Sequence, residues 1–373
     1  MDDSPECARY SLWPLRHSMN LLDKIGREFS GFNLLESGKR LFDRKPLQCS
    51  LYLTDRCNLD CSYCTEYDNS RPHPKLEDLK IWIKKIRDLG TMRIALVGGE
   101  PLMHPNVVEI VRYCRELGFA TSLTTNGFLL TRKLLKQLEE AGLQVMQISV
   151  DRMTPSPVTK KSFKTILPKL DYFKDSKISL HITGVICADT LPESKAVLET
   201  GLSRAIPTEV RLVHADPLSR FRVERGNKEE LEAFIDSMIE RKRRGEKIHT
   251  NEAILRYQKS LLRGEPVEWT CTAGYKLFFV SAQGKFWECS MVHTDKHIMD
   301  VTLDDLYANY RKKSCQTGCG VYCAVSTSLL VQNPASVISK EVVNRARRIP
   351  GLIKQAISTP EPTEPSQPAP AEA

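Results

Sequence analysis

Short apolar segments alternate with amphipathic helical segments from residue 47 onward. Six segments have the composition of buried strands: 47–53, 93–97, 120–125, 145–150, 178–186 and 209–213. Between them, apolar residues recur at helical spacing, and the first three helical stretches end at Gly90, Gly118 and Gly142. Strands that alternate with helices of ~10–15 residues are typical of a parallel sheet with crossover helices. The pattern predicts an α/β fold, which periodicity leaves open between a partial barrel and an open doubly wound sheet.

The pattern changes on both sides of these six units. Between Met19 and Phe42, apolar and basic residues alternate at near-helical spacing. We interpret this stretch as a helix that closes one end of the domain; the alternative is a helix that rests on a membrane or a lipid. The expected organisation is an N-terminal helical lead-in (1–46), a core (47–216), a helical bridge (217–266), a cysteine-rich module (267–326), a C-terminal helical segment (327–358) and a disordered Pro-rich tail (359–373).

Composition narrows the functional classes. The chain has 373 residues, of which 41% are apolar and 27% charged, as in ordinary globular proteins. No signal peptide and no run of about 18 apolar residues occurs, so we expect a cytoplasmic protein without a membrane span. Twelve cysteines in a reducing compartment indicate metal or redox chemistry rather than disulfides. The net charge of +8 comes from scattered basic groups, which gives no reason to expect a nucleic-acid partner.

Three thiols follow the first predicted strand directly. Cys57, Cys61 and Cys64 have the spacing C-x3-C-x2-C. In parallel α/β folds, functional residues lie on the loops at the C-terminal ends of the strands, where these thiols stand. A structural zinc site uses four protein ligands, and no fourth ligand of the usual spacing follows. Three cysteines can instead hold three irons of a [4Fe–4S] cluster and leave the fourth iron open to another ligand.

This stretch resembles the cluster-binding motif of the radical S-adenosylmethionine (SAM) superfamily, with Tyr63 at its aromatic position. After the second strand, Gly98-Gly99-Glu100-Pro101 matches the superfamily's Gly-Gly-Glu-Pro motif. Each motif alone has a simpler interpretation, a zinc site or a tight turn. Because both occur on successive loops of a βα repeat, the chain is identified as a member of this superfamily. The resemblance implies a partial (β/α)6 barrel.

The resemblance also implies cofactors and their contacts. The open iron of a [4Fe–4S] cluster would bind S-adenosylmethionine, whose reductive cleavage yields a 5′-deoxyadenosyl radical that abstracts hydrogen from the substrate. The implied cluster ligands are Cys57, Cys61 and Cys64. The implied cofactor contacts are Tyr63, Gly98, Gly99, Glu100, Pro101, Thr125, Asn126, Ser149 and Asp151. An Asn-Gly turn and a strand-end cap explain Asn126 and Asp151 equally well, and Arg152 stands where many relatives have glycine.

Five further cysteines lie in the C-terminal module: Cys271, Cys289, Cys315, Cys319 and Cys323. The run Cys271-x12-Gly284-x4-Cys289 resembles the opening hairpin of the auxiliary-cluster modules called SPASM and twitch. A full SPASM module has seven cysteines, so five indicate a twitch-like module with a single auxiliary [4Fe–4S] cluster. Its ligands would be the first two thiols and two of the last three. Zinc is the alternative metal, and His293 is a candidate neighbour of the site.

The predicted function is that of a radical SAM enzyme acting on an unidentified substrate: a small molecule, a lipid-linked molecule or a peptide. An auxiliary cluster would assist electron transfer or substrate binding, and flavodoxin or ferredoxin would donate electrons. Residues 1–46 are too few for the leader-binding domain of many peptide-modifying members, which disfavours a leader-dependent maturase. The alternative function is a non-catalytic iron–sulfur redox sensor or accessory protein. The glycine-rich motif argues against it, because a sensor has no need of a SAM-binding loop.

Overall fold

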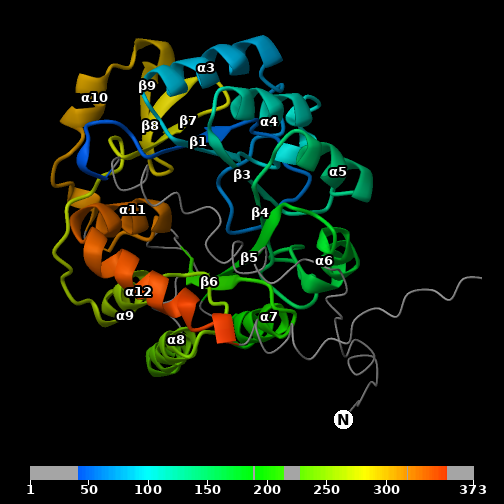
Figure 1. The fold of residues 1–373 in the computed structure, drawn as a ribbon, viewed down its shortest axis with the longest axis vertical. Helices are drawn as coiled ribbons and strands as arrows, with labels where there is room; N and C mark the ends of the chain where they lie inside the picture. Colours follow the sequence, from blue (N-terminus) through cyan, green and yellow to red (C-terminus); the bar gives the residue numbers. More distant parts are fainter. Residues whose placement is uncertain (1–40, 188–189, 214–226, 317, 351–373) are drawn as a thin grey trace, which may run out of the picture.

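A computed structural model describes residues 41–187, 190–213, 227–316 and 318–350 (Figure 1). The helix expected between residues 19 and 42 and the tail expected over 359–373 fall almost entirely outside these ranges. Within the described residues, no helix combines the length and the apolar composition that a membrane span requires.

Six parallel strands form the N-terminal half of the described chain. They are β1 (Gln48–Tyr52), β2 (Arg93–Val97), β3 (Ala120–Thr125), β4 (Val145–Ser149), β5 (Ser179–Ile186) and β6 (Thr208–Leu212). Figure 1 shows the connecting helices around the outside of these strands: α3 (Leu76–Asp88), α4 (Val107–Glu116), α5 (Arg132–Glu140), α6 (Phe163–Leu170) and α7 (Leu191–Ser203). Short 3-10 turns lie at η2 (Pro101–Met103) and η3 (Asp171–Phe173). The six strand segments predicted from the sequence are confirmed to within two residues at each end.

The order of the strands decides between the two predicted architectures. The nine-stranded sheet runs β6-β5-β4-β3-β2-β1-β7-β8-β9, so each of the first six strands lies beside its neighbour in sequence. A doubly wound sheet reverses its strand order at a switch point, and these six strands contain no reversal. The fold is therefore an α/β fold of the partial-barrel type.

The C-terminal part extends this sheet on the β1 side. β7 (Leu277–Val280) pairs parallel to β1, and β8 (Lys285–Cys289) and β9 (Val292–His297) follow antiparallel. The remaining elements are α8 (Lys228–Arg243), α9 (Glu252–Arg263), η5 (Ile298–Asp300), α10 (Leu303–Ala308), η6 (Ser314–Gln316), α11 (Tyr322–Gln332) and α12 (Pro334–Ala346). The predicted hairpin around Gly284 is confirmed, and the hairpin is joined directly to the first strand of the core.

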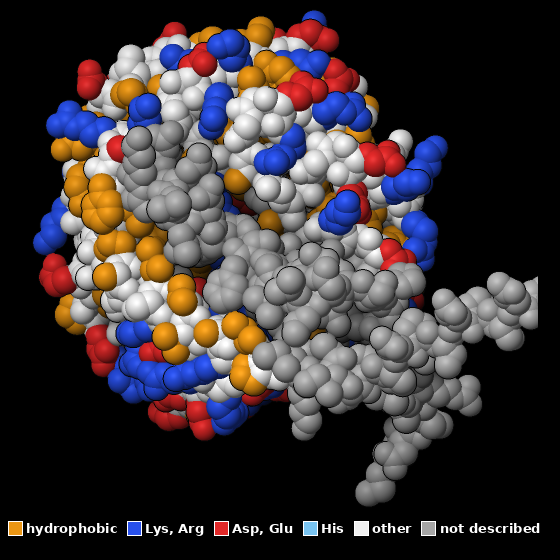
Figure 2. Space-filling model, in the orientation of Figure 1, with side chains coloured by type: hydrophobic (Ala, Val, Ile, Leu, Met, Phe, Trp, Pro, Cys, Tyr) orange, Lys and Arg blue, Asp and Glu red, His pale blue; other side chains and the backbone are white. Residues whose placement is uncertain are grey.

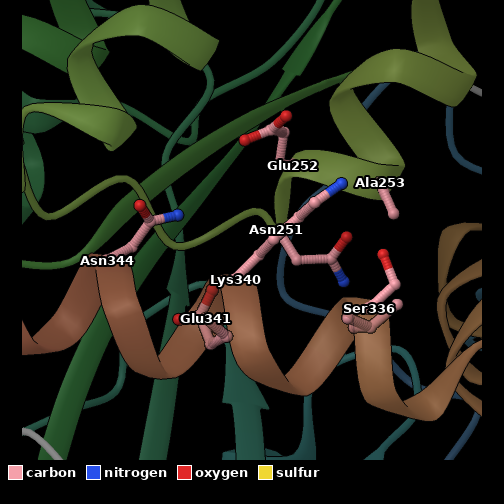
Figure 3. A pocket seen from close by; sticks show the side chains of 8 residues that line it. Asn251, Glu252, Ala253, Ser336, Lys340, Glu341 and Asn344 are labelled. Carbon is pink, nitrogen blue, oxygen red and sulfur yellow. The ribbon is translucent and has the colours of Figure 1, made fainter.

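A buried ion pair attaches α12 to the bridge helices. The Lys242 ammonium donates to the carbonyl of Ile248 at 3.0 Å and pairs with Glu341 at the same distance. Figure 3 shows a small hollow beside it, between the start of α9 and α12. This hollow is lined by no cysteine or histidine. On the face shown in Figure 2, Lys and Arg side chains are spread among Asp and Glu in several groups, as the sequence predicted.

The two faces of the parallel sheet differ in burial. Ile94, Leu96, Met146 and Ile148 point toward the helices and are fully buried. Residues that alternate with them along β2, β3 and β4 point to the inside of the barrel and are only half-buried. The hydrophobic core therefore lies between the strands and the outer helices, not inside the barrel.

This difference predicts unequal costs for two neighbouring truncations on β4. Met146→Ala removes a fully buried side chain and should lower the free energy of unfolding by about 2–5 kcal/mol. Val145→Ala truncates a half-buried, inward-facing side chain and should cost at most about 1 kcal/mol. Urea denaturation of both variants measures the difference. Equal losses would contradict the assignment of the core to the helix side of the sheet.

Candidate functional site

The three predicted cluster thiols lie together on the loop between β1 and α3. Cys61 is buried, whereas Cys57 and Cys64 are partly exposed. The loop is held by its own backbone: the Cys64 N–H donates to the Cys61 carbonyl at 2.9 Å, and the Cys57 N–H donates to the Asn69 side chain at 2.9 Å. The thiols are therefore presented at the C-terminal end of the first strand, where the sequence placed them.

The glycine motif packs directly against this loop. The Gly99 N–H donates to the Thr54 carbonyl at 3.0 Å, and the Glu100 N–H donates to the Arg56 carbonyl at 2.8 Å. A β-carbon added to Gly98 would lie 2.3 Å from the Thr54 carbonyl oxygen, and one added to Gly99 would lie 2.4 Å from that of Arg56. Gly98 also has φ +140°. Glycine is required at both positions because no side chain fits between the two loops.

Glu100 is almost completely buried, with 1% of its surface exposed. Its carboxylate accepts from the Thr125 hydroxyl at 2.6 Å, the Asn126 N–H at 2.7 Å and the Leu102 N–H at 3.0 Å. Burial raises the pKa of this carboxyl above its ordinary value, although the three hydrogen bonds oppose the shift. These bonds fix the orientation of Glu100 and leave about one of its acceptor positions for an external donor.

Thr125 and Asn126 connect the third strand to the first loop. The Asn126 amide donates to the Asn58 side chain at 2.8 Å and lies 3.9 Å from the Cys57 sulfur. The Thr125 hydroxyl also accepts from the Gly127 N–H at 2.9 Å. Both residues therefore position the loops around the thiols. Another predicted contact, Ser149, faces the barrel interior from β4, and its hydroxyl makes no hydrogen bond with the residues that the structure describes.

Lys161 is a site residue that the sequence analysis did not single out. Its ammonium donates to the Tyr63 hydroxyl at 3.1 Å, and that hydroxyl donates in turn to Asp151. Thr159 bridges Asp151, at 3.1 Å, and the Cys61 sulfur, at 3.3 Å. Burial lowers the pKa of Lys161, but Tyr63, Asp151 and the neighbouring thiols outweigh it and raise this pKa well above its ordinary value. This hydrogen-bond network holds the positive charge of Lys161 close to the three cluster thiols.

The positive charge of Lys161 affects the pKa values of two of the thiols. Burial raises the pKa of Cys57 and Cys64 above the ordinary value, whereas Lys161 lowers both. Lys161 thus favours the thiolate forms that bind metals. No motif marks this lysine, because it lies on the long loop after β4, which returns to the cysteine loop and bonds to it through the Ser62 N–H and the Val158 carbonyl. In the sequence, Lys160-Lys161 has the composition of a solvated surface pair.

The C-terminal module touches the cysteine loop. The Gln283 amide, on the turn between β7 and β8, donates to the Asp55 carboxylate, which also accepts from Arg71 at 3.1 Å. Tyr52 lies within electrostatic range of Cys64 and Cys323, and its ring packs edge-on against Trp287, with centroids 5.3 Å apart. Polar and aromatic contacts therefore join the cysteine loop and the end of β1 to the C-terminal module.

Four of the five C-terminal thiols interact as one set. Burial, together with the neighbouring thiols of Cys271, Cys289 and Cys315, raises the pKa of Cys319 to about 12. The corresponding interactions connect Cys271, Cys289 and Cys315 with one another. Cys323 differs: burial raises its pKa to about 11, Arg211 opposes this shift, and Cys289 is the thiol that affects it. Cys323 therefore interacts with one thiol of this set, whereas Cys319 interacts with three.

His293 takes no part in this set. Its ring stacks on Trp287 with centroids 3.7 Å apart, and its Nε2 lies 2.9 Å from the Ser290 carbonyl oxygen. The hydrogen bond and the stacking account for its position in the hairpin. The prediction that it neighbours an auxiliary cluster stays a prediction.

The donor sets fit iron–sulfur clusters better than a single ion. Within the described residues, no three or more His, Cys, Asp or Glu side chains are grouped closely enough to hold one metal ion. Four thiolates on one zinc would lie about 4 Å from one another. In a [4Fe–4S] cluster each thiolate binds a different iron, so the sulfurs stand farther apart, and thiolates are the ligands such clusters use. Both cysteine groups are compatible with this wider arrangement.

Comparisons with known proteins agree with this geometry. Residues 51–194 match the model of the Radical SAM superfamily. The chain is 31% identical over 191 residues to "Molybdenum cofactor biosynthesis protein 1" of Bos taurus, covering 47% of this chain and 29% of that protein. It is 36% identical over 107 residues to "PqqA peptide cyclase" of Bradyrhizobium diazoefficiens, covering 28% of each. The chain thus spans about a third or less of either relative.

A solved structure matches more of the fold. "Native anSMEcpe with bound AdoMet" superposes with a TM-score of 0.56 at 18% identity, over 84% of this chain and 99% of that one. At this identity the match shows the fold alone. Proteins of the superfamily use a [4Fe–4S] cluster and S-adenosylmethionine, which suits the thiols and the glycine motif described above. Residues 51–194 of this chain, which contain the cysteine loop and Gly98–Pro101, form a domain of the Radical SAM superfamily.

Proposed function

We propose that this chain is a radical SAM enzyme with two [4Fe–4S] clusters. Cys57, Cys61 and Cys64 would hold the first cluster, within the core expected over residues 47–216. The main support for the proposal is the direct backbone contact between the cysteine loop and the Gly98–Pro101 loop. This contact places a rigid polar loop beside the three thiols that would bind the cluster. The auxiliary cluster would lie in the module expected over 267–326, on Cys271, Cys289, Cys315 and Cys319.

When bound, the first cluster and S-adenosylmethionine supply one-electron reductive chemistry that produces a 5′-deoxyadenosyl radical. This chain's residues would bind and orient the cofactor. Glu100, fixed by three donors, offers an acceptor to the amino group, as do the backbone oxygens of its loop. Lys161 offers a cation to the carboxylate. Tyr63 and Asp151 would hold that lysine in place.

The proposed auxiliary cluster would assist electron transfer or bind substrate. An external donor such as flavodoxin or ferredoxin would supply the electron. The names of the relatives point to different substrates, a cofactor pathway in one and a peptide in the other. A small molecule, a lipid-linked molecule and a peptide therefore stay open as substrate classes.

An assay of S-adenosylmethionine cleavage distinguishes an enzyme from a non-catalytic redox sensor. Wild-type protein, reconstituted anaerobically with iron and sulfide, reduced with dithionite and given S-adenosylmethionine, should form 5′-deoxyadenosine, which chromatography with mass detection quantifies. Cys61→Ala should form none, because the cluster loses one of three ligands. A wild-type protein with an intact cluster that forms no 5′-deoxyadenosine would overturn the enzymatic function.

Glu100→Gln tests the cofactor-binding loop. An amide presents one acceptor oxygen in place of two, so the donors at Thr125 and Asn126 can no longer both be satisfied. We expect S-adenosylmethionine to bind about tenfold more weakly or worse, measured by equilibrium dialysis, with unchanged iron content. Glu116→Gln, an exposed change on α4, is the matched control. Equal affinity in Glu100→Gln and wild type would show that this carboxylate does not organise the cofactor site.

Iron analysis tests which thiols hold the auxiliary cluster. In a background in which Cys57, Cys61 and Cys64 are all alanine, about four irons per chain should remain. Adding Cys319→Ala should remove most of them, whereas adding Cys323→Ala should leave them in place, because Cys323 lies outside the four-thiol set. Bound zinc without iron in this background would contradict the assignment, as would iron loss with Cys323→Ala.

A further inference from the structure

The inward-pointing side chains of the barrel strands are mostly not fully buried. We define the lumen face as the inward-pointing positions of β1 to β6. They are Gln48, Ser50, Tyr52, Arg93, Ala95, Val97, Ala120, Ser122, Thr124, Val145, Gln147, Ser149, Ser179, His181, Thr183, Val185, Glu209 and Arg211. Most are half-buried, although strands and helices surround them. In a barrel filled by side chains these positions would be buried. Their partial exposure leaves this face of the sheet accessible to water and to a polar ligand.

The lumen face is polar. On these six described strands it contains no leucine, isoleucine, phenylalanine or methionine. Its apolar members are alanines, valines and Tyr52. By contrast, the helix face of the same strands carries most of the core residues, such as Leu96 and Ile148. A long apolar chain in this space would leave the polar groups unsatisfied, which costs free energy. The lumen therefore fits a polar substrate portion.

Arg93 differs from the other charged groups on this face. It is the first residue of β2 and lies in register with Gln48 and Ala120, neither of which is charged. Its guanidinium makes no hydrogen bond or ion pair with the described part of the chain. The Arg93 side chain is half-buried, and burial lowers the pKa of its guanidinium below the ordinary value. A partly desolvated cation with no partner among the described residues is unfavourable, and a bound anion would reduce this cost.

The charged side chains on β5 and β6 do not provide an anion for Arg93. Arg211 pairs with Glu209 at 3.0 Å, and Glu209 also accepts from Thr183 at 3.0 Å. Next to them, His181 stacks on His249 with ring centroids 4.1 Å apart. Burial lowers the pKa of both imidazoles, so they are neutral at pH 7. Arg211 and Glu209 cancel, and the lumen face keeps the single positive charge of Arg93.

We propose that Arg93 binds an anionic group of the substrate, a phosphate or a carboxylate, on the floor of the lumen. The planar guanidinium suits both groups, because it donates two parallel hydrogen bonds to either. Arg93 and the Gly98–Pro101 loop lie at opposite ends of β2, about 13–16 Å apart along the strand. A substrate that reaches from Arg93 to that loop is an extended polar molecule with an anion at its far end. This inference deepens the proposed function, on which it rests for the position of the reacting end.

Anion binding to three variants tests the proposal. Isothermal titration calorimetry of the cluster-loaded protein would use inorganic pyrophosphate in one arm and glutarate in the other. We expect the wild type to bind at least one of them at a single site. Arg93→Gln should weaken that binding at least tenfold, and Arg93→Lys, which keeps the charge, should weaken it less. Arg112→Gln, an exposed change on α4, should bind like the wild type. The arm that shows binding identifies the anion as phosphate or carboxylate.

Three results would overturn the inference. They are the absence of binding of either anion to the wild type at millimolar concentration, equal binding by wild type and Arg93→Gln, and equal losses in the Gln and Lys variants. Thermal melting without anion excludes a structural cause. Arg93→Gln should melt no lower than the wild type, because it removes a partly desolvated charge that has no partner among the described residues, and a fall of more than about 3 °C would show a structural role.

The same titration separates this inference from the proposed function. The variant in which Cys57, Cys61 and Cys64 are alanine lacks the first cluster but keeps Arg93, so it should still bind the anion. Anion binding that depends on Arg93 in a wild type that forms no 5′-deoxyadenosine would refute the enzymatic proposal and keep the anion site. Formation of 5′-deoxyadenosine together with anion binding that does not depend on Arg93 would keep the enzymatic proposal and refute the anion site.

Discussion

The close contact between two backbone segments determines the geometry of the candidate site. Gly98 and Gly99 lie so near the carbonyl groups of Thr54 and Arg56 that no β-carbon fits at either glycine. Two hydrogen bonds fix this contact, and the carboxylate of Glu100 then connects it to β3. Three successive strands thus end in one rigid polar assembly around the thiols. Rigidity matters here, because a binding site loses selectivity when its contacts shift by as little as 1 Å.

The polar inside of the barrel is possible because the hydrophobic core lies between the strands and the outer helices. Its apolar residues face the helices, which leaves the inward positions free to carry polar side chains without loss of the main hydrophobic stabilisation. The auxiliary hairpin continues the same sheet from β1, so the second cysteine group is positioned by strand pairing and not by a flexible linker. Both cysteine groups and the lumen therefore belong to one continuous framework.

Much of this could be predicted from the sequence, because the determining signals are local. Apolar strands and glycine-terminated helices fix the six units, and both the cysteine loop and the glycine motif are contiguous. Lys161 could not be found in this way, since it joins the thiols only through a loop that returns from β4. The distinction between Cys319 and Cys323 likewise depends on packing: each follows the preceding cysteine at the same spacing, but Cys323 is the one influenced by Arg211. That Arg93 has no partner among the residues of known position is visible only once its neighbours in three dimensions are described.

In the proposed site, three thiols hold a cluster whose fourth iron meets a cofactor positioned by Gly98–Pro101. Electron–nuclear double resonance of the reduced protein with S-adenosylmethionine labelled with ¹⁵N at its amino group would detect this arrangement. We expect a ¹⁵N coupling of the size typical of a nitrogen bound to iron, and its loss in Cys61→Ala. A reduced, intact cluster in the wild type that shows no ¹⁵N coupling at saturating cofactor would contradict it.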